Sequence, residues 1–369
     1  MNVLPAVLGV ALLLGVAIDV FFTVLTGRGG GWLTNALTRG PWAALLWVHD
    51  RRPIHRALAV AGPLLVLAIV LTWYALGVLG WSLVFYGSDQ SIIDSDKFPV
   101  VDFPRTVFFV GTTFSTLGYG NLLPHGLPWT VLGNLTALSG TVILTAALSY
   151  VFAVLQASVE RRQLAAMINT VGQTPARFVE RGWAGEDRGA IDDHILSIAR
   201  QITLHAEKHV NYPILQYFHS DRWQKAPAPA VLVFSDAMFL VRHGLRGDDR
   251  PAESLIHLCE RSITNYLAQS RLTDGVHTAA GDHDPDTDTI PDALDPAQLR
   301  GLGLSTVPRA DFEAAYRDYA QRREGLVELA HNDGWTPVVW PPEDAGDADA
   351  EPVEVIAKSE GDRPSRRVA

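Results

Sequence analysis

The sequence predicts an all-α membrane protein with three transmembrane helices, one shorter re-entrant helix and a helical C-terminal domain. Charge is the first observation. The 369-residue chain has 30 Lys and Arg and 40 Asp and Glu, but residues 1–157 carry only 13 of these charged side chains. Apolar length is the second, because residues 3–26, 57–87 and 127–159 each exceed the roughly 20 residues that a helix needs to cross a bilayer. This division excludes a purely soluble enzyme, and the net charge of −10 argues against a nucleic-acid partner.

Residues 3–26 predict the first transmembrane helix. They lack the basic N-terminal region and the small-residue cleavage site of a secretory signal, so we expect the helix to be retained. Asp19 is the one charged residue in this stretch, and a bare carboxylate is costly in hydrocarbon. We expect Asp19 either to make a polar contact between helices or to be protonated.

The following segment, residues 32–48, is apolar but contains Arg39 and Pro41 and has a Trp near each end. This composition favours a helix that lies in the membrane interface, with a fourth span as the alternative. Residues 1–56 therefore form one predicted unit, an N-terminal transmembrane helix followed by an interfacial segment.

Residues 57–162 predict the second and third spans with a short helix between them. No Asp, Glu, Lys or Arg occurs between Arg105 and Glu160. That uncharged window is too long for one span and too short for two spans joined by an ordinary loop. It therefore predicts a half-span before the last full span.

Charges in the loops predict the orientation, because short cytoplasmic loops are rich in Lys and Arg. The basic residues between the first two spans are Arg28, Arg39, Arg51, Arg52 and Arg56. The charged residues of the loop after the second span are mostly acidic: Asp89, Asp94, Asp96, Lys97 and Asp102. We therefore expect a multi-pass protein of the cell inner membrane, with the N-terminus outside and the C-terminal domain in the cytoplasm.

The half-span and the residues after it carry the most specific motif. Residues 103–124 read FPRTVFFVGTTFSTLGYGNLLP, with Pro104 in a position suited to a first helical turn. Residues 116–121, TLGYGN, do not have a helical pattern, and such backbone is tolerated at membrane depth only where it is buried in protein or lines a water-filled path. The two glycines permit positive φ, which lets successive carbonyl groups point the same way.

This segment resembles the pore domain of tetrameric potassium channels, and the resemblance covers roughly residues 58–162. The motif TTxSTxGYG stands in a pore-sized half-span between two full spans, in the order of that family. The resemblance implies a homotetramer that conducts potassium ions passively, without enzyme activity and without a cofactor. The residues whose carbonyl groups would form the selectivity filter and bind potassium are Thr116, Leu117, Gly118, Tyr119 and Gly120.

The resemblance also assigns residues that support the filter. Thr112 and Thr113 on the pore helix would pack behind it, and Asn121 would stand at its outer end. The Tyr119 ring would brace the loop against an aromatic side chain of the pore helix. The candidate rings are Phe108, Phe109 and Phe114.

Two residues depart from the family pattern. Leu117 stands where Val or Ile is usual, and Asn121 stands where Asp is common. The packing behind the filter and the charge at its outer mouth therefore differ, so a weakly selective cation channel is the alternative to a potassium-selective one. A membrane-anchored sensor or enzyme with a vestigial pore is a second alternative, although residues 158–333 show no nucleophile–base or phosphate-binding motif.

Gly140 in the third span lies where related channels have a hinge glycine. Glycine costs about 1 kcal/mol inside a helix, so its presence needs a reason. A gating hinge and close helix packing are the two candidate reasons. The candidates for lining the inner pore mouth below it are Thr145, Leu148 and Phe152.

Helical periodicity predicts that residues 163–272 form a cytoplasmic domain. Within it, residues 231–241 are apolar but too few for a span, which favours a buried core helix. Residues 273–308 are rich in Asp, Gly and Pro and predict a linker. Residues 309–334 predict a further helix, and residues 335–369 a disordered tail.

His205 and His209 are weak candidates for a metal pair, because residues four apart share one face of a helix. A packed or solvated pair is the favoured interpretation. The domain has neither a G-x-G-x-x-G fingerprint after a strand nor an evident cyclic-nucleotide cassette. The expected partners are therefore the lipid bilayer and other copies of the chain, and no cytoplasmic ligand or gating stimulus is predicted.

Overall fold

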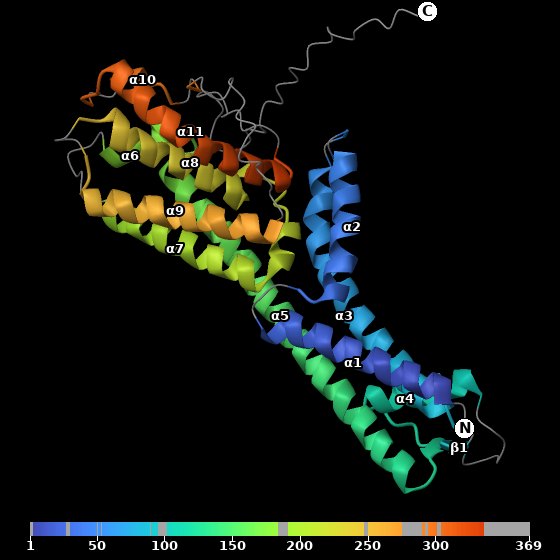
Figure 1. Cartoon of the computed structure of the whole chain (residues 1–369). Coiled ribbons are helices and arrows are strands. Elements are labelled where there is room, and N and C mark those ends of the chain that lie inside the picture. Colours follow the sequence, from blue (N-terminus) through green and yellow to red (C-terminus); the bar gives the residue numbers. More distant parts are fainter. Residues whose placement is uncertain are drawn as a thin grey trace, which may run out of the picture.

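The computed structural model describes residues 3–26, 30–49, 51–52, 54–88, 90–94, 102–183, 191–246, 250–274, 290–291, 294–300 and 304–335. The described elements are almost all helices (Figure 1). Three of them are long and apolar enough to cross a membrane: α1 (Val3–Leu25), α3 (His55–Tyr86) and α5 (Leu127–Val171). The predicted all-α membrane fold with three long apolar helices is confirmed.

Helix α1 runs antiparallel along α3, and glycines let the two backbones approach closely. A Cβ atom added at Gly9 would lie 2.5 Å from the carbonyl oxygen of Gly80, and one added at Gly80 would lie 2.8 Å from Leu13 Cγ. Larger residues at either position would push the helices apart. The outer face of α1 is apolar and exposed, as expected for a surface in contact with lipid.

Asp19 lies in the middle of this helix pair and is fully buried. Its carboxylate accepts hydrogen bonds at 2.8 Å from the Leu33 N–H, the Thr34 hydroxyl and the Trp73 indole N–H. Leu33 and Thr34 belong to the first turn of α2 (Trp32–His49), so Asp19 satisfies the N-terminus of that helix and ties α1 to α3. The polar contact between helices expected for Asp19 is present.

Helix α2 lies beside the beginning of α3 and does not qualify as a candidate span (Figure 1). Its Trp42 ring contacts Tyr217 in the short helix η1 (Pro213–Tyr217), with 5.4 Å between ring centroids. Gly62 of α3 passes the same segment so closely that an added Cβ atom would lie 2.7 Å from the Tyr217 carbonyl oxygen. The N-terminal helices therefore contact the C-terminal domain directly.

Three short elements connect α3 to α5: β1 (Ile92–Asp94), α4 (Phe103–Phe114) and β2 (Leu122–Pro124). The two strands pair antiparallel, so the segments before α4 and after the glycine-rich residues lie together. Asp102 caps the N-terminus of helix α4, and its Oδ1 accepts a hydrogen bond from the Arg105 N–H at 3.0 Å. This helix packs between α3 and α5 and corresponds to the predicted half-span (Figure 1).

Helix α5 is continuous over 45 residues and is about 67 Å long at 1.5 Å per residue. It therefore extends beyond a bilayer and becomes part of the C-terminal domain, without a break between the two (Figure 1). The other helices of that domain are α6 (Pro175–Trp183), α7 (Asp192–Asn211), η2 (Trp223–Lys225), α8 (Pro227–Phe239), η3 (Leu240–Gly244), α9 (Glu253–Asp274), α10 (Ala297–Arg300) and α11 (Arg309–Asn332).

Helix α8 is the centre of this domain, and all its residues are buried. The buried core helix expected for residues 231–241 is thus present. Its Asp236 accepts hydrogen bonds from the Tyr319 hydroxyl at 2.6 Å and from Arg323 Nε at 3.1 Å, both on α11. Burial raises the pKa of Asp236, and the Arg323 guanidinium opposes that shift.

The described part of residues 273–308 differs from the predicted linker. Three of its leucines are fully or almost fully buried in the domain core: Leu294, Leu299 and Leu304. Their apolar burial fixes this part to the domain, although its Asp, Gly and Pro content predicted otherwise. Trp335, the first residue of the expected tail, is also buried, and residues 336–369 lie outside the described residues.

Candidate functional site

The candidate site is the segment that follows α4, residues 116–120, here called the GYG loop. Positive φ occurs at alternate residues: Thr116 (60°), Gly118 (57°) and Gly120 (78°). The residues between them, Leu117 and Tyr119, have negative φ. Alternation of the sign of φ permits successive carbonyl groups to point toward one side of the chain, and carbonyl groups arranged in this way can replace the water around a cation.

The last turn of α4 holds the GYG loop in place. The carbonyl oxygen of Thr112 accepts hydrogen bonds from the N–H groups of Leu117 at 2.8 Å and Gly118 at 3.1 Å. The carbonyl oxygen of Thr113 accepts one from the Thr116 N–H at 3.0 Å. Thr112 and Thr113, the two residues expected to support the filter, therefore contact the loop through their backbone carbonyl groups. These bonds stabilise the positive φ of Thr116, which is unusual for a residue with a side chain.

An aromatic stack supports the loop from the side. The Tyr119 ring lies parallel to Phe108 of α4, with 5.6 Å between centroids and 22° between planes. The other two candidate rings pack against α3 instead: Phe109 contacts Phe85, and Phe114 contacts Tyr74. Among the three predicted braces, Phe108 is the one that the structure brings to Tyr119.

Phe114 occupies a narrow space between α3 and α5. A Cβ atom added at Gly77 of α3 would lie 2.7 Å from Phe114 Cζ. One added at Gly140 of α5 would lie 2.0 Å from the Phe114 carbonyl oxygen. Gly140 therefore lets the end of α4 rest against α5, which is the packing reason considered above. Helix α5 continues through this position, and a hinge there stays a prediction.

The GYG loop and one face of α5 are exposed in a single chain. Tyr119 is 67% exposed and Leu117 is 62% exposed. The three candidates for the inner mouth are exposed as well: Thr145, Leu148 and Phe152. Exposed polar backbone is not stable in hydrocarbon, so within a bilayer this side of the chain needs neighbouring protein or water.

His205 and His209 lie together on α7, both buried, with their ring centroids 6.0 Å apart. Burial lowers the pKa of His205 well below its ordinary value, helped by the nearby Arg161 charge. The His205 ring also packs against Tyr266, 5.6 Å away. Among the residues that the structure describes, no group of three or more His, Cys, Asp or Glu side chains is arranged to hold a metal ion. This geometry favours the packed pair.

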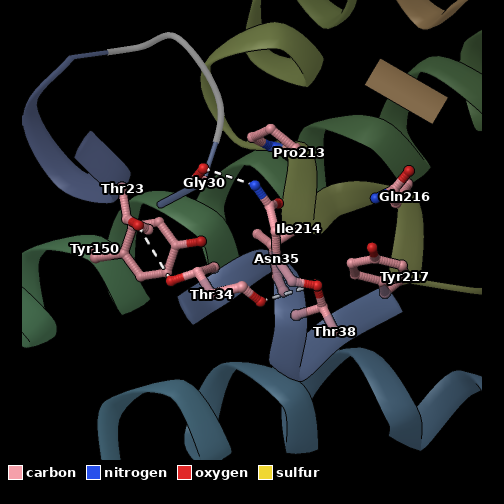
Figure 2. A pocket seen from close by; sticks show the side chains of 10 residues that line it. All are labelled: Thr23, Gly30, Thr34, Asn35, Thr38, Tyr150, Pro213, Ile214, Gln216 and Tyr217. Carbon is pink, nitrogen blue, oxygen red and sulfur yellow. Dashed lines mark hydrogen bonds between the residues drawn. The ribbon is translucent and has the colours of Figure 1, made fainter. Parts of the chain in front are cut away.

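A small pocket beside α5 has no counterpart in the sequence predictions (Figure 2). The Thr23 and Thr34 hydroxyl oxygens lie 3.1 Å apart on one side of it, and Thr34 also binds Asp19. The pocket is lined by Thr23, Gly30, Thr34, Asn35, Thr38, Tyr150, Pro213, Ile214, Gln216 and Tyr217. Its lining comes from α1, α2, α5, η1 and the residue Gly30 between α1 and α2, so no local pattern of the sequence indicates it.

Comparisons with known proteins agree with this geometry. Residues 66–157, which include α4, the GYG loop and most of α5, match the model of a family described as "Ion channel". The chain is 26% identical to the "Uncharacterized membrane protein YdjJ" of Bacillus subtilis (strain 168) over 322 residues, which cover 87% of this chain and 91% of the relative. No solved structure matches the chain. The protein is therefore a membrane protein in which residues 66–157 are similar to the pore domain of ion channels.

Proposed function

We propose that the chain is one subunit of a homotetrameric, potassium-selective channel that conducts ions passively. The observation that carries the proposal is the positive φ at alternate residues of the GYG loop, which permits its carbonyl groups to point to one side. The position of this loop at the carboxyl end of α4, between two long apolar helices, supports the same function. The ion channel family match over residues 66–157 adds independent support.

A single GYG loop cannot surround an ion, which is why the proposal includes four copies of the chain. Four loops around one axis present four carbonyl groups at each level, and these oxygens take the place of water around potassium. The carboxyl end of α4 carries partial negative charge, which favours a cation nearby. The exposed apolar residues on α5 and the exposed Leu117 and Tyr119 are then surfaces for neighbouring subunits.

The proposed orientation follows from the loop charges. The basic segment between α1 and α3 faces the cytoplasm, and the acidic loop before α4 faces the outside. The C-terminal domain is then cytoplasmic in the cell inner membrane. Because α5 runs without interruption from the pore into this domain, movement of the domain reaches the pore directly.

Rubidium uptake by liposomes that contain the purified full chain tests the function. We expect uptake above that of empty liposomes, and loss of uptake in Gly118→Asp and Gly120→Asp, because both substitutions force a side chain into positive φ. Gly40→Asp is the matched control, since a Cβ atom at the exposed Gly40 meets nothing within 4 Å. Uptake that survives both filter substitutions contradicts the proposal.

A weakly selective cation channel is the second candidate, and Leu117 and Asn121 are the observations that favour it. The reversal potential across a bilayer with equal and opposite potassium and sodium gradients, and both ions present on both sides, separates the two candidates. A value close to the potassium equilibrium potential supports the selective channel, and a value near zero supports the weakly selective one. Leu117→Val introduces the side chain usual in the family. If packing at this position limits selectivity, this substitution shifts the reversal potential toward the potassium equilibrium potential.

A further inference from the structure

One antiparallel bridge joins two distant segments of the C-terminal domain by pairing Leu245 with Thr306. Beside it, the Arg246 N–H donates a hydrogen bond to the Ser305 carbonyl oxygen at 2.8 Å. The segment before Leu245 is η3, a π-helix, and this rare geometry occurs mostly at functional sites. The contact, here called the 245–306 bridge, therefore holds the residues that follow η3 against residues that precede α11.

Three arginine side chains are anchored on the 245–306 bridge, each through its Nε–H group. Arg246 Nε donates to the Thr306 carbonyl oxygen at 3.0 Å, and Arg300 Nε, at the end of α10, donates to the Thr306 hydroxyl oxygen at 2.8 Å. Arg250 Nε donates to the Leu245 carbonyl oxygen at 2.7 Å. We call Arg246, Arg250 and Arg300 the arginine cluster.

The anchoring bonds leave most donors of the arginine cluster unused. A guanidinium carries N–H donors on Nε and on both Nη nitrogens, and each anchoring bond uses only the Nε donor. Within the part of the chain that the structure describes, the Nη groups of these three arginines have no hydrogen-bond or ion-pair partner. All three side chains are exposed. Their Nη groups are therefore available to a ligand from solvent, while the Nε bonds limit the freedom that binding would otherwise cost.

Other arginines of the same region are paired with carboxylates. Arg242 contacts Glu253 and Glu260, and Arg309 contacts Glu313. Carboxylates are abundant, because the chain has 40 Asp and Glu against 30 Lys and Arg. The lack of a carboxylate partner for the arginine cluster, among the described residues, therefore distinguishes this surface from its surroundings.

The charges that act on His243, in η3, agree with an excess of positive charge near the 245–306 bridge. Burial lowers the pKa of the His243 imidazole, and positive charges lower it further against one carboxylate. The positive charges are those of Arg242, Arg250 and Arg322, and the carboxylate is that of Glu253. A chain with a net charge of −10 thus has a locally basic surface at this point.

We propose that the arginine cluster binds a soluble small molecule that carries a phosphate group. Paired N–H groups of arginine match the oxygen atoms of phosphate and carboxylate groups. A phosphate group has more charge and more accepting oxygens than a carboxylate, so it can accept from more than one guanidinium. Arg246 and Arg300, which are anchored on the same threonine, repel each other, and a multiply charged anion between them relieves that repulsion.

The position of the arginine cluster favours a soluble ligand over a lipid headgroup. Arg300 ends α10, and Figure 1 shows α10 at the end of the C-terminal domain that is far from α1 and α4. Lipids of the bilayer around α1 therefore do not reach this surface. The proposed site does not depend on the proposed channel function.

Calorimetric titration of the full chain with pyrophosphate tests the site. The chain is held in nanodiscs of zwitterionic lipid, with potassium acetate as the salt. We expect saturable binding of pyrophosphate to each chain. The double substitution Arg246→Gln and Arg300→Gln removes both guanidiniums at Thr306. It is expected to weaken binding by at least about 100-fold, because each hydrogen bond from a charged group contributes about 10-fold or more.

Two further variants separate the geometry of the site from its charge. Arg200→Gln with Arg317→Gln is the matched control, because both arginines are exposed and their loss changes the net charge equally. We expect this control to bind pyrophosphate like the unchanged chain. Arg246→Lys with Arg300→Lys keeps the charge but removes the paired N–H groups, so we expect binding to weaken about 10-fold. Unfolding temperatures without ligand check the folding of each variant, and the lysine variant decides if the glutamine variant does not fold.

The outcomes that overturn the proposal are distinct. Absence of saturable pyrophosphate binding contradicts the site, as does equal binding by the glutamine variant and its control. Equal binding by the lysine variant contradicts the role of the paired N–H groups. Binding of succinate as tight as that of pyrophosphate contradicts the choice of phosphate over carboxylate.

Anionic lipid in the nanodiscs separates the two sources of phosphate. An unchanged affinity for pyrophosphate supports a soluble ligand, whereas competition by the anionic lipid contradicts it. None of these measurements requires ion flux. Loss of rubidium uptake therefore contradicts only the proposed channel function, and loss of pyrophosphate binding contradicts only the proposed site.

Discussion

Arg161 Nη2 and Asp333 Oδ1 lie 2.6 Å apart, and this contact joins helix α5 to the end of α11 across 172 positions of the sequence. Both side chains are only 6% exposed. A buried ion pair depends on both partners, because the charge that remains after loss of one partner is neither hydrated nor compensated. The contact therefore ties the end of α11 to α5.

Substitution of Arg161 by Met is expected to destabilise the protein by about 3 kcal/mol, since it leaves the buried Asp333 carboxylate without its cation. Thermal unfolding in detergent, followed by tryptophan fluorescence, measures the loss. Arg309→Met is the matched control, because Arg309 forms an exposed ion pair with Glu313 on the same helix that Asp333 follows. Equal unfolding temperatures for the two variants contradict the structural role of the Arg161–Asp333 pair.

Asp19→Asn is expected to destabilise the N-terminal helices although the side chain keeps its size. Both carboxylate oxygens of Asp19 accept hydrogen bonds, so an amide nitrogen in place of one oxygen faces the Trp73 N–H or the first turn of α2. An unsatisfied buried group costs about 1–3 kcal/mol. The unfolding temperature of the variant is compared with that of Asp318→Asn, an exposed position on α11. A protonated native Asp19 predicts little change, and that outcome contradicts the carboxylate assignment.

Gly140→Ala distinguishes packing from hinge motion. A methyl group at this position meets the Phe114 carbonyl oxygen at 2.0 Å, so we expect loss of stability and of assembled protein. Gly133→Ala in the same helix is the control, because its nearest neighbour would be Pro124 Cγ at 3.7 Å. That substitution is tolerated, and alanine favours the helix by about 1 kcal/mol. If Gly140→Ala keeps full stability and alters only open probability, the hinge interpretation replaces the packing one.

Phe108→Leu removes the ring that stacks on Tyr119. Such an aromatic pair contributes about 0.5–1.5 kcal/mol beyond the area it buries, so the GYG loop becomes less rigid. We expect the reversal potential under opposing potassium and sodium gradients to move away from the potassium equilibrium potential and toward zero. We expect little effect on the unfolding temperature. Phe22→Leu on the outer face of α1 is the control and leaves the reversal potential unchanged. A reversal potential equal to that of the unchanged chain shows that the stack does not support the loop.

Local patterns of the sequence were sufficient for several parts of the fold. Long apolar stretches predicted α1, α3 and α5, because hydrophobicity over about 20 residues is a property of the segment itself. The alternating backbone of the GYG loop was expected from Gly118 and Gly120, since glycine adopts positive φ without steric cost. The positive φ of Thr116 was not expected, because it depends on hydrogen bonds that the loop N–H groups donate to carbonyl oxygens of α4.

Composition misled where a few apolar residues decide the packing. Residues 273–308 have the composition of a linker, yet Leu294, Leu299 and Leu304 are buried in the core of the domain. Burial of single side chains in a preformed core does not require a periodic pattern, so averaging over the segment conceals it. The choice of aromatic partner for Tyr119 also depends on packing. The sequence left three candidate rings, and in the structure Phe108 stacks on Tyr119.

The sequence by itself determined the division into an apolar and a charged part, the three long helices, and the loop whose glycines permit a cation site. Only the tertiary structure decided that Gly140 receives the end of α4, that Asp19 caps α2, and that His55 meets His219 across 164 positions. The physical reason is the distance along the chain over which each effect acts. Hydrophobicity and backbone preference act within a segment, whereas the protonation and partners of a buried polar group depend on which distant segments surround it.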